Sequence, residues 1–361
     1  MVGAHAQIAD AAALSIAARV DGVDRADITA AIAPGGPLVK TYGPRGTVHL
    51  LPRDDLPLWC AALSAAPPTS SQAIGVRLDA AQTDQVVEAI ATALDEAADS
   101  GRELDRDELD AAVSARLGAW ASELVMPAFG GMWPRWRQAI STAAHRGVLA
   151  FGAGRGTRVT YVNPGVEVPE DGESALDWLL LRYLASYGPA TPAQFGRWMA
   201  GSVGWANTRF ARLADTLTRV DITNDAGVPL SAAPGSAGAM VATSDASFDG
   251  EPATGIRLLG HFDPYVVGSY PRDLVFPGDA AARALNRGQA GNLPVILRDG
   301  VVAGVWHAAR SAKSVAITVE PLVRLSRAER SAAEHEGERI AAFIGLEPRV
   351  AFGVVTVGAH A

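Results

Sequence analysis

The sequence predicts a mixed α+β fold that is mainly α, built from three successive helical segments that each end in a short β-hairpin. Apolar residues recur at helical spacing in several stretches before residue 220, and glycine turns separate the paired β-rich runs that follow them. Beyond residue 238 the pattern changes to strands. Helices followed by a tight hairpin are the order of elements typical of a winged helix. We therefore expect three tandem winged helices and a β-rich C-terminal segment.

The predicted domains are residues 1–66, 67–168, 169–237 and 238–361. The predicted elements of the first domain are a helix opening at residues 24–27 and the strands 38–42 and 47–51, joined by the turn Gly43-Pro44-Arg45-Gly46. A proline- and glycine-rich break at residues 34–37 separates the helix from this hairpin, which has the form expected of a wing.

The second and third domains repeat this order. In the second domain, helices are predicted at 80–98, 103–117 and 134–147, and strands at 148–151 and 157–162. In the third domain, helices are predicted at 174–187, 191–200 and 205–219, with a short hairpin near 220–230. Thr191 is a favoured N-cap residue and Pro192 fits the first helical position, so together they mark the start of one of these helices.

The C-terminal domain is predicted to be a sheet followed by a helix. Strands are expected at 255–267, 293–297, 301–306 and 314–319, and a helix at 327–344. The second and third of these strands flank Arg298-Asp299-Gly300, and an Asp-Gly pair between β-rich runs is a strong hairpin signal.

Composition excludes several classes of protein. The chain has 361 residues, of which 48% are apolar and 19% charged, so it has no signature of disorder. A single cysteine, Cys60, excludes a disulfide framework and a cysteine-rich metal site. No apolar run approaches the ~20 residues that span a membrane, and no basic and apolar leader opens the chain, so we expect a cytoplasmic protein.

The net charge of −8 conceals a segregated charge pattern. Eleven acidic residues lie between Asp79 and Asp110, whereas residues 28–53, 124–166 and 178–214 contain none. These acid-free windows fall on predicted hairpins and late helices, where phosphate contacts need basic side chains without acids alongside. The alternative is that acidic and basic residues on a solvated surface are separated in this way by chance. The candidate DNA contacts are Arg45, Thr47, His49, Arg135, Arg137, Arg155, Arg158 and Arg197. The alternative for the first three is a structural role, in which they stabilise the turn of their own hairpin.

Two polar residues near the start of the chain are candidates for chemistry. His5 and Gln7 are two positions apart, which places both side chains on one face of an extended segment. Taken alone the pair is a weak signal, because two solvated polar residues on a terminal turn give the same pattern. Its meaning therefore depends on the rest of the chain.

Four segments together resemble one family. Val2–Gln7, Lys40–Leu51, Leu258–Gly268 and Pro294–Trp306 are similar, in this order, to segments of the winged-helix DNA glycosylases of the AlkZ/YcaQ type. The resemblance implies three winged helices in a C-shaped array around double-stranded DNA. It also implies a monomeric, monofunctional glycosylase that removes bulky N7-alkylated purines, including crosslinked ones. Such an enzyme needs no cofactor and does not bind a membrane.

His5 departs from the motif of that family. The family's catalytic motif is Gln-x-Gln, or Gln-x-Asp in the YcaQ branch, so that Gln7 matches the second position and His5 stands in place of the first glutamine. The His-x-Gln form resembles that of members which protect producers of DNA-alkylating natural products from their own compound. Self-resistance is therefore an expected role.

These residue types suit the hydrolysis of a cationic nucleoside. An N7-alkylguanine already carries positive charge, so the enzyme has to position a water below C1′ and stabilise an oxocarbenium-like transition state. Gln7 can orient the water through its amide oxygen, and His5 can accept the water's proton. Asp263 is a candidate to stabilise the developing charge, or else a turn-forming residue before Pro264. Lyase chemistry needs an amine, and neither lysine of the chain lies in the motif, so we expect no strand cleavage.

Two other functions fit parts of the pattern. A non-catalytic winged-helix protein, acting as a regulator or a lesion binder, would have no need of the His5/Gln7 pair. A nuclease would need carboxylates that converge on a metal ion, whereas the acids between Asp79 and Asp110 have helical spacing and indicate a solvated face turned away from DNA. The histidines show no metal-ligand spacing either, so we predict no metal site.

Overall fold

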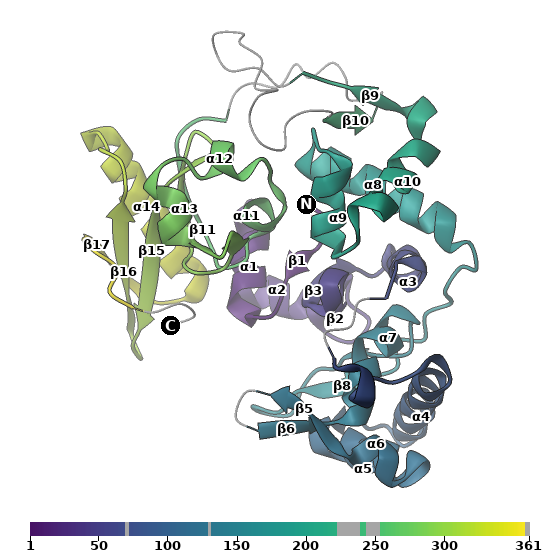
Figure 1. The fold of residues 1–361 in the computed structure, drawn as a ribbon. Helices are drawn as coiled ribbons and strands as arrows, with labels where there is room; N and C mark the ends of the chain where they lie inside the picture. Colours follow the sequence, from purple (N-terminus) through teal and green to yellow (C-terminus); the bar gives the residue numbers. More distant parts are fainter. Residues whose placement is uncertain (69–71, 129–130, 222–238, 243–252, 358–361) are drawn as a thin grey trace. The chain divides into compact units, whose positions relative to one another are not determined.

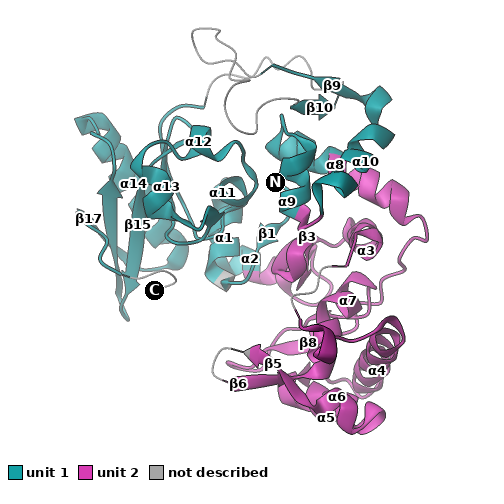
Figure 2. Ribbon diagram, in the orientation of Figure 1, with its two compact units in different colours: residues 1–28, 181–198, 202–361 teal, residues 29–180, 199–201 magenta. Residues whose placement is uncertain are grey.

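Figure 1 shows the computed structural model of the chain, which describes residues 1–68, 72–128, 131–221, 239–242 and 253–357. These residues form a mixed α+β fold in which helices predominate, which confirms the predicted fold class at that level. The three winged helices, the C-shaped array and the four domain boundaries stay predictions. Two compact units make up the chain (Figure 2): unit 1 contains residues 1–28, 181–198 and 202–361, and unit 2 contains residues 29–180 and 199–201.

Unit 2 begins with the predicted basic hairpin. Its first elements are α2 (Arg25–Ile32), which carries the chain over from unit 1, then β2 (Leu38–Tyr42), η1 (Pro44–Gly46), β3 (Val48–Pro52) and α3 (Leu56–Ala65). The two strands pair antiparallel, and Arg45 at the turn has a φ of +61°. Buried Thr41 donates its hydroxyl to the carbonyl oxygen of Leu149 at 3.2 Å. This bond fixes the hairpin to a later segment of the same unit.

The second part of unit 2 contains, in chain order, a helix, a strand, two helices and two further strands. The elements are α4 (Ala80–Asp99), β4 (Leu104–Asp105), α5 (Arg106–Leu117), α7 (Ile140–His145), β7 (Ala150–Phe151) and β8 (Thr160–Val162). Both long helices begin at capping boxes, formed by Asp79 with Gln82 and by Asp105 with Glu108. The strand order is β4-β8-β7, and the core of this part is centred on the buried Trp136.

A second hairpin, absent from the sequence prediction, interrupts this order between α5 and α7. The additional elements are η2 (Ile74–Val76), α6 (Ala119–Ser122), β5 (Leu124–Ala128), β6 (Gly131–Pro134) and η3 (Arg135–Ala139). Leu124, Met132 and Trp133 on the hairpin are exposed, whereas Trp136 is buried and donates its indole N–H to Asp110 at 2.6 Å. Because apolar side chains of this hairpin face solvent, the usual alternation of apolar and polar residues gives no signal here.

Helix α8 carries the chain back to unit 1, where helices pack around a cluster of aromatic rings. The elements are α8 (Gly172–Tyr187), α9 (Pro192–Met199), α10 (Val203–Arg212), η4 (Ala214–Thr216), β9 (Leu217–Arg219) and β10 (Met240–Ala242). Thr191 and Gln194 cap α9 reciprocally, which confirms the predicted helix start. The Phe195 ring contacts those of Tyr183 and Trp198. Most of the hairpin predicted near residue 220 lies outside the described residues, and β9 pairs with β10.

The rest of unit 1 is a five-stranded sheet, ordered β11-β14-β15-β16-β17, with helices on both faces. The elements are β11 (Ile256–Leu259), α11 (Pro264–Gly268), α12 (Arg272–Val275), α13 (Asp279–Ala284), β12 (Leu285–Asn286), β13 (Gln289–Ala290), β14 (Val295–Arg298), β15 (Val301–Arg310), β16 (Ser314–Pro321), α14 (Arg327–Ile344) and β17 (Glu347–Phe352). Ile296 packs with the α14 side of the core, whereas its neighbour Val295 packs with the α13 side. Asp299 and Gly300, both at positive φ, form the predicted two-residue hairpin.

Two features of this region differ from the sequence prediction. The strand predicted over residues 255–267 is wrong beyond Leu259, because Asp263 caps a helix: its carboxylate accepts a hydrogen bond from the N–H of Tyr265 at 2.9 Å, and Pro264 occupies the first helical position. The sequence also gave no sign of β17, which runs parallel to β16 and is reached only through α14.

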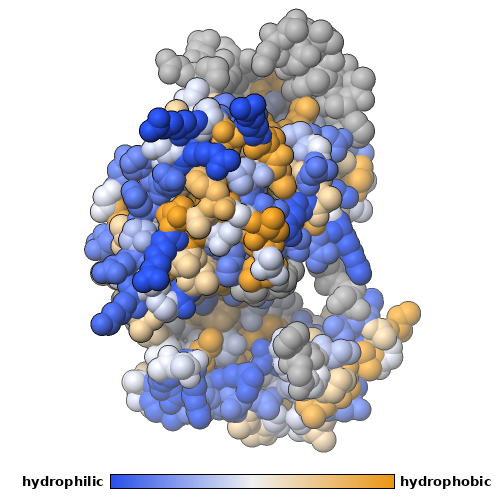
Figure 3. Space-filling model, turned by 90° about the vertical axis from the view of Figure 1, so that its left-hand side faces the viewer, coloured by the Kyte–Doolittle hydropathy of each residue, from blue (hydrophilic) through white to orange (hydrophobic). Residues whose placement is uncertain are grey.

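No helix within the described ranges is both long enough and apolar enough to cross a bilayer. The face drawn in Figure 3, which includes the side of the molecule where β16 and β17 lie, mixes hydrophilic side chains with small apolar patches.

Candidate active site

His5 and Gln7 lie on the short segment that leads into the first helix of unit 1. Strand β1 (Ala4–His5) is extended, and α1 (Ala9–Ala17), which the sequence analysis missed, begins two residues after Gln7. His5 is only 8% exposed, whereas Gln7 is exposed. The alanines beside His5 are buried as well. The pair is therefore divided between the two environments, with the imidazole largely removed from solvent and the amide open to it.

A buried ion pair ties this segment to α11. Both carboxylate oxygens of Asp263, which is fully buried, accept hydrogen bonds from the Arg19 guanidinium, at 2.9 and 2.6 Å. Arg19 also donates to the carbonyl oxygen of Ser15 at 2.7 Å. Burial alone would lower the pKa of Arg19, but the hydrogen bond to Asp263 and the charge of that carboxylate raise it. The structure thus places Asp263 as the N-cap of α11 and the partner of Arg19, with both of its oxygens in use.

Phe262 connects this ion pair to His5. Its ring centroid lies 6.0 Å from that of His5 and 5.8 Å from that of His261. The backbone of Phe262 is in the left-handed region, with φ +52°. Gly291 lies against the ring so closely that a Cβ atom there would be 2.0 Å from Cε1 of Phe262. Phe262 is thus held between the candidate catalytic histidine and the backbone of another loop.

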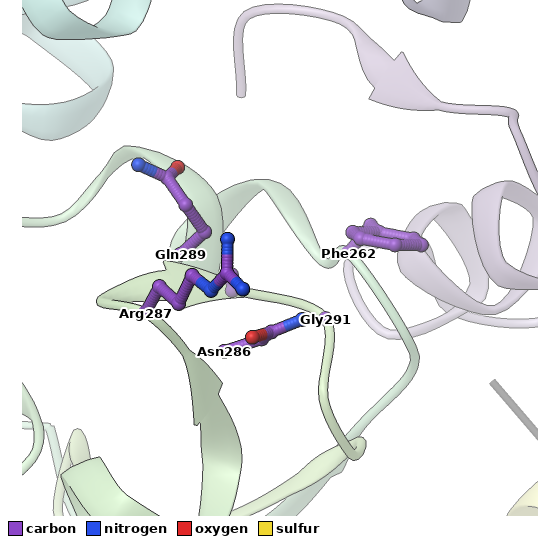
Figure 4. Close-up of a pocket in the computed structure, with 6 residues that line it drawn as sticks. Phe262, Asn286, Arg287, Gln289 and Gly291 are labelled. Atoms are coloured by element: carbon purple, nitrogen blue, oxygen red, sulfur yellow. The ribbon is translucent and has the colours of Figure 1, made fainter. Parts of the chain in front are cut away.

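A cavity of about 450 Å³ opens beside Phe262. Its lining consists of Phe262, Asn286, Arg287, Gln289, Ala290 and Gly291. Figure 4 shows Arg287 and Gln289 projecting from one side of the cavity and Phe262 on the other. Arg287 and Gly288, with φ +51° and +76°, form the two-residue turn between β12 and β13. The sequence analysis missed this hairpin, although a glycine after an exposed arginine between two short runs is a usable turn signal.

The predicted contacts on the first hairpin, Arg45, Thr47 and His49, lie in unit 2, and the structure places them differently. His49 is 2% exposed, its Nδ1 lies 2.9 Å from the carbonyl oxygen of Thr47, and burial lowers its pKa to about 3. Thr47 donates its hydroxyl to the carbonyl oxygen of Pro44 at 3.0 Å. Arg45 is half-buried at the turn. The ring of His49 therefore supports the turn, which leaves Arg45 as the basic group nearest the tip.

Four basic candidates lie on the second part of unit 2, and three of them have carboxylate partners. Arg158 pairs with Asp105 at 2.8 Å, Arg155 pairs with Asp105 at 3.2 Å and with Glu108, and Arg135 pairs with Glu123. Hydrogen bonds from the Glu108 amide and from Arg158 lower the pKa of Asp105. Asp105, which was predicted to lie on a solvated face turned away from DNA, is instead buried, and with Glu108 it pairs with two of the predicted DNA contacts.

Arg137 and Arg197 are in other surroundings. The guanidinium of Arg137 lies 4.6 Å from the ring centroid of exposed Trp133, a cation–π arrangement that keeps its charge. Arg197 is exposed on α9 in unit 1, and the structure records no ion pair for it among the described residues. Neither side chain has a carboxylate partner in the ion pairs of the described residues.

A metal centre has no visible basis in the part of the chain that the structure describes. No group of three or more histidine, cysteine, aspartate or glutamate side chains there is arranged to hold a metal ion. Cys60 is buried, and burial raises the pKa of its thiol to about 12, so the thiol stays protonated.

Comparison with known proteins gives a consistent result at the level of sequence and of structure. The family described as "DNA glycosylase AlkZ-like" matches residues 1–343. An "Interstrand DNA cross-link repair glycosylase" of Streptomyces sahachiroi is 30% identical over 360 residues, which cover 96% of this chain and 89% of that protein. The solved structure of Streptomyces sahachiroi DNA glycosylase AlkZ is similar with a TM-score of 0.74 and 27% identity, over 97% of this chain and 91% of that one.

The Arg19–Asp263 pair makes a testable contribution to stability. Asp263→Asn keeps an N-cap residue but leaves a guanidinium without its counter-charge, so we expect the free energy of unfolding to fall by about 3 kcal/mol. Arg19→Met should cost a similar amount. Urea unfolding of both variants and of the double variant measures the coupling, and we expect the double loss to be smaller than the sum by more than about 1 kcal/mol. Strictly additive losses would show that the pair does not act as a unit.

Two histidines of unit 2, the buried His49 and the half-buried His145, predict a pH dependence of stability. Burial lowers the pKa of His49 to about 3 and that of His145 to about 4. The unfolded chain binds these protons near pH 6.5 and the folded chain does not, so stability should fall as the pH drops below 6.5, by up to about 1.4 kcal/mol per pH unit for each histidine.

Urea midpoints between pH 7.5 and 5 measure this slope. His145→Gln should reduce it by about half, since one of the two titrations is removed, and the exposed His335→Gln serves as the matched control. A midpoint that is flat over this range, or a slope unchanged by His145→Gln, would contradict the assignment.

Proposed function

The chain belongs to the AlkZ-like family of DNA glycosylases, as its sequence resemblance predicted, and we propose that its substrate is a bulky N7-alkylguanine in double-stranded DNA. The observation that carries the proposal is the cavity of about 450 Å³ whose wall, Phe262, contacts the candidate catalytic His5. A volume of this size falls in the range that holds drug-sized ligands. The name of the 30% identical relative, a crosslink repair glycosylase, supports crosslinked and natural-product adducts as members of this substrate class.

In the proposed reaction a water molecule attacks C1′ of the modified nucleotide. The C1′–N9 bond breaks, its electron pair goes to the base, and the cationic base leaves as a neutral N7-alkylguanine. His5 takes the proton that the water loses, and the exposed amide of Gln7 orients the water through its oxygen. An imidazole suits this role because its ordinary pKa lies near neutrality. Since the leaving base already carries positive charge, no general acid is needed.

We assign Asp263 a positioning role. Its two oxygens are both bonded to Arg19, so it is not available as a separate anion for the developing charge. Arg19 follows α1, and α1 follows the His5/Gln7 segment, so the ion pair fixes the helix into which that segment leads. Asp263 thereby acts on the reaction through the geometry of the motif.

For DNA binding we propose Arg45, Arg137 and Arg197 as the principal phosphate contacts. Arg137 and Arg197 have no carboxylate partner in the ion pairs of the described residues, and Arg45 lies at the turn of the first hairpin, where it is the basic group nearest the tip. The charges of Arg135, Arg155 and Arg158 are already balanced by carboxylates, so a phosphate contact at these residues should contribute less to binding. Thr47 and His49 support the turn that presents Arg45.

The product should be an intact strand with an abasic site. Lys40, the lysine nearest the candidate residues of the first hairpin, is half-buried with its Nζ 5.1 Å from the ring centroid of Phe151. Burial lowers its pKa, and neither Lys40 nor Lys313 lies in the His5/Gln7 motif. We therefore expect strand breaks only after alkali treatment of the product.

Single-turnover release of a bulky N7-guanine adduct from an oligonucleotide duplex tests the catalytic assignment. His5→Ala and Gln7→Ala should each lower the rate by ~10²-fold or more, because each removes a group that acts on the attacking water, while binding to the duplex is unchanged. His335→Ala, which removes an exposed histidine on α14, is the matched control and should keep the parent rate.

Two outcomes would contradict the assignment. Release that both variants leave unchanged would place the reaction elsewhere in the chain. Binding of the modified duplex without any release by the parent would instead favour a lesion-binding protein.

A pair of arginine variants tests the proposed phosphate contacts. Arg197→Ala should weaken binding to unmodified duplex and reduce the slope of log Kd against log salt by about one, because a full positive charge is lost. Arg158→Ala removes an equal charge that Asp105 already balances, so it should change the slope much less. Fluorescence anisotropy over a salt series measures both. Equal slopes for the two variants would mean that the pairing with Asp105 is broken in the complex.

A further inference from the structure

We propose that Phe262 is a specificity-determining residue: its ring stacks on the planar part of a bulky adduct and makes the enzyme prefer aromatic adducts to N7-methylguanine. This inference rests on the proposed function and assigns part of its substrate preference to one side chain. Phe262 is the aromatic member of the cavity lining and the residue through which the cavity meets His5.

The backbone at this position is unfavourable for the residue that occupies it. A φ of +52° places a bulky L-residue in the left-handed region, which such residues rarely adopt. Such strain persists only where the surroundings over-determine it, and it is concentrated at functional sites. Here the next residue, Asp263, is fixed by the Arg19 ion pair and by capping α11. The conformation aims the ring at the cavity instead of continuing β11.

Gly291 provides the second constraint. Its own φ is +116°, and a Cβ atom there would lie 2.0 Å from Phe262 Cε1, so any other residue would displace the ring. The backbone of this loop therefore approaches the edge of Phe262 directly. The ring is held from two directions, by its own strained backbone and by Gly291, which makes it a rigid surface.

The chemistry of the cavity suits a flat, partly polar guest. Phe262 and Ala290 supply apolar surface, while Asn286, Arg287 and Gln289 on the β12–β13 hairpin supply donors and an acceptor (Figure 4). A planar aromatic group can stack on Phe262 while its oxygen substituents accept hydrogen bonds from Arg287. A methyl group offers neither interaction. The cavity therefore distinguishes adducts by the group attached to N7 and not by the guanine.

The test compares two duplexes that differ only in the adduct at one guanine. One carries N7-methylguanine and the other the planar, polycyclic N7-guanine adduct of aflatoxin B1. Single-turnover rates and the enzyme concentration for half-maximal rate are measured for the parent and three variants. Phe262→Leu keeps an apolar side chain of similar size, Phe262→Tyr keeps the ring, and Phe262→Asn relieves the backbone because asparagine tolerates positive φ.

The parent should release the aromatic adduct more efficiently than the methylated base. Phe262→Leu and Phe262→Asn should lower the ratio of the two efficiencies about tenfold, because they remove the ring that stacks on the aromatic adduct and no group that a methyl substituent could contact. Phe262→Tyr should retain the parent ratio. Thermal unfolding of each variant provides a separate measure of folding.

Three results would overturn the inference. Equal losses for both adducts would mean that Phe262 only holds His5 in place, and an unchanged ratio would mean that the ring does not contact the adduct. In both cases the proposed glycosylase activity still stands, because the parent releases base. A parent that releases neither adduct would refute the proposed substrate class, and this inference with it.

Discussion

The bidentate ion pair between Arg19 and Asp263 is the constraint on which the candidate site depends. It joins residues 244 positions apart in the sequence, one following the helix after the His5/Gln7 segment and the other capping α11. A buried pair of this kind contributes little net stability compared with apolar packing, but breaking it is costly. Its value here is geometric, since the buried carboxylate admits only one arrangement of guanidinium and helix end. The adjacent residue is Phe262, so the same pair helps to hold the strained backbone that places an aromatic ring beside His5.

The electrostatics of the site follow from this pairing. A free carboxylate beside the cavity would attract a cationic nucleobase in the ground state as well as in the transition state, which gains nothing in rate. Because Arg19 and Asp263 neutralise one another, the proposed attack of water relies on the imidazole of His5 and the amide of Gln7. Such a site is suited to a lesion that carries its own positive charge, where activation of the water matters more than protonation of the leaving group.

The sequence predicted elements whose signals are local. α14 was predicted with its observed ends, the Asp299-Gly300 turn was predicted from two residues, and the start of α9 from Thr191 and Pro192. The family was predicted from four motif segments and is confirmed. β17 could not be predicted, because its partner β16 is brought beside it only by tertiary folding. Arg155 and Arg158 lie in an acid-free window of sequence, yet carboxylates about 50 residues earlier neutralise them. A stretch of sequence without acidic residues gives a positive surface only where folding brings no carboxylate from another part of the chain beside it.

The placement of the catalytic candidates could be predicted only in part, and the reason is physical. Two residues apart on an extended segment, His5 and Gln7 were expected to share a face, yet His5 is buried and Gln7 is exposed. The spacing of two residues determines to which face of a strand their side chains point. Whether a side chain is buried depends on what packs against it, and for His5 this includes the ring of Phe262, which lies in a loop more than 250 residues later. The amide of Gln7 is open to water, whereas the imidazole of His5 lies among buried alanines and near the ring of Phe262. The placement of His5 therefore depends on tertiary packing, which the spacing of two residues along the sequence does not encode.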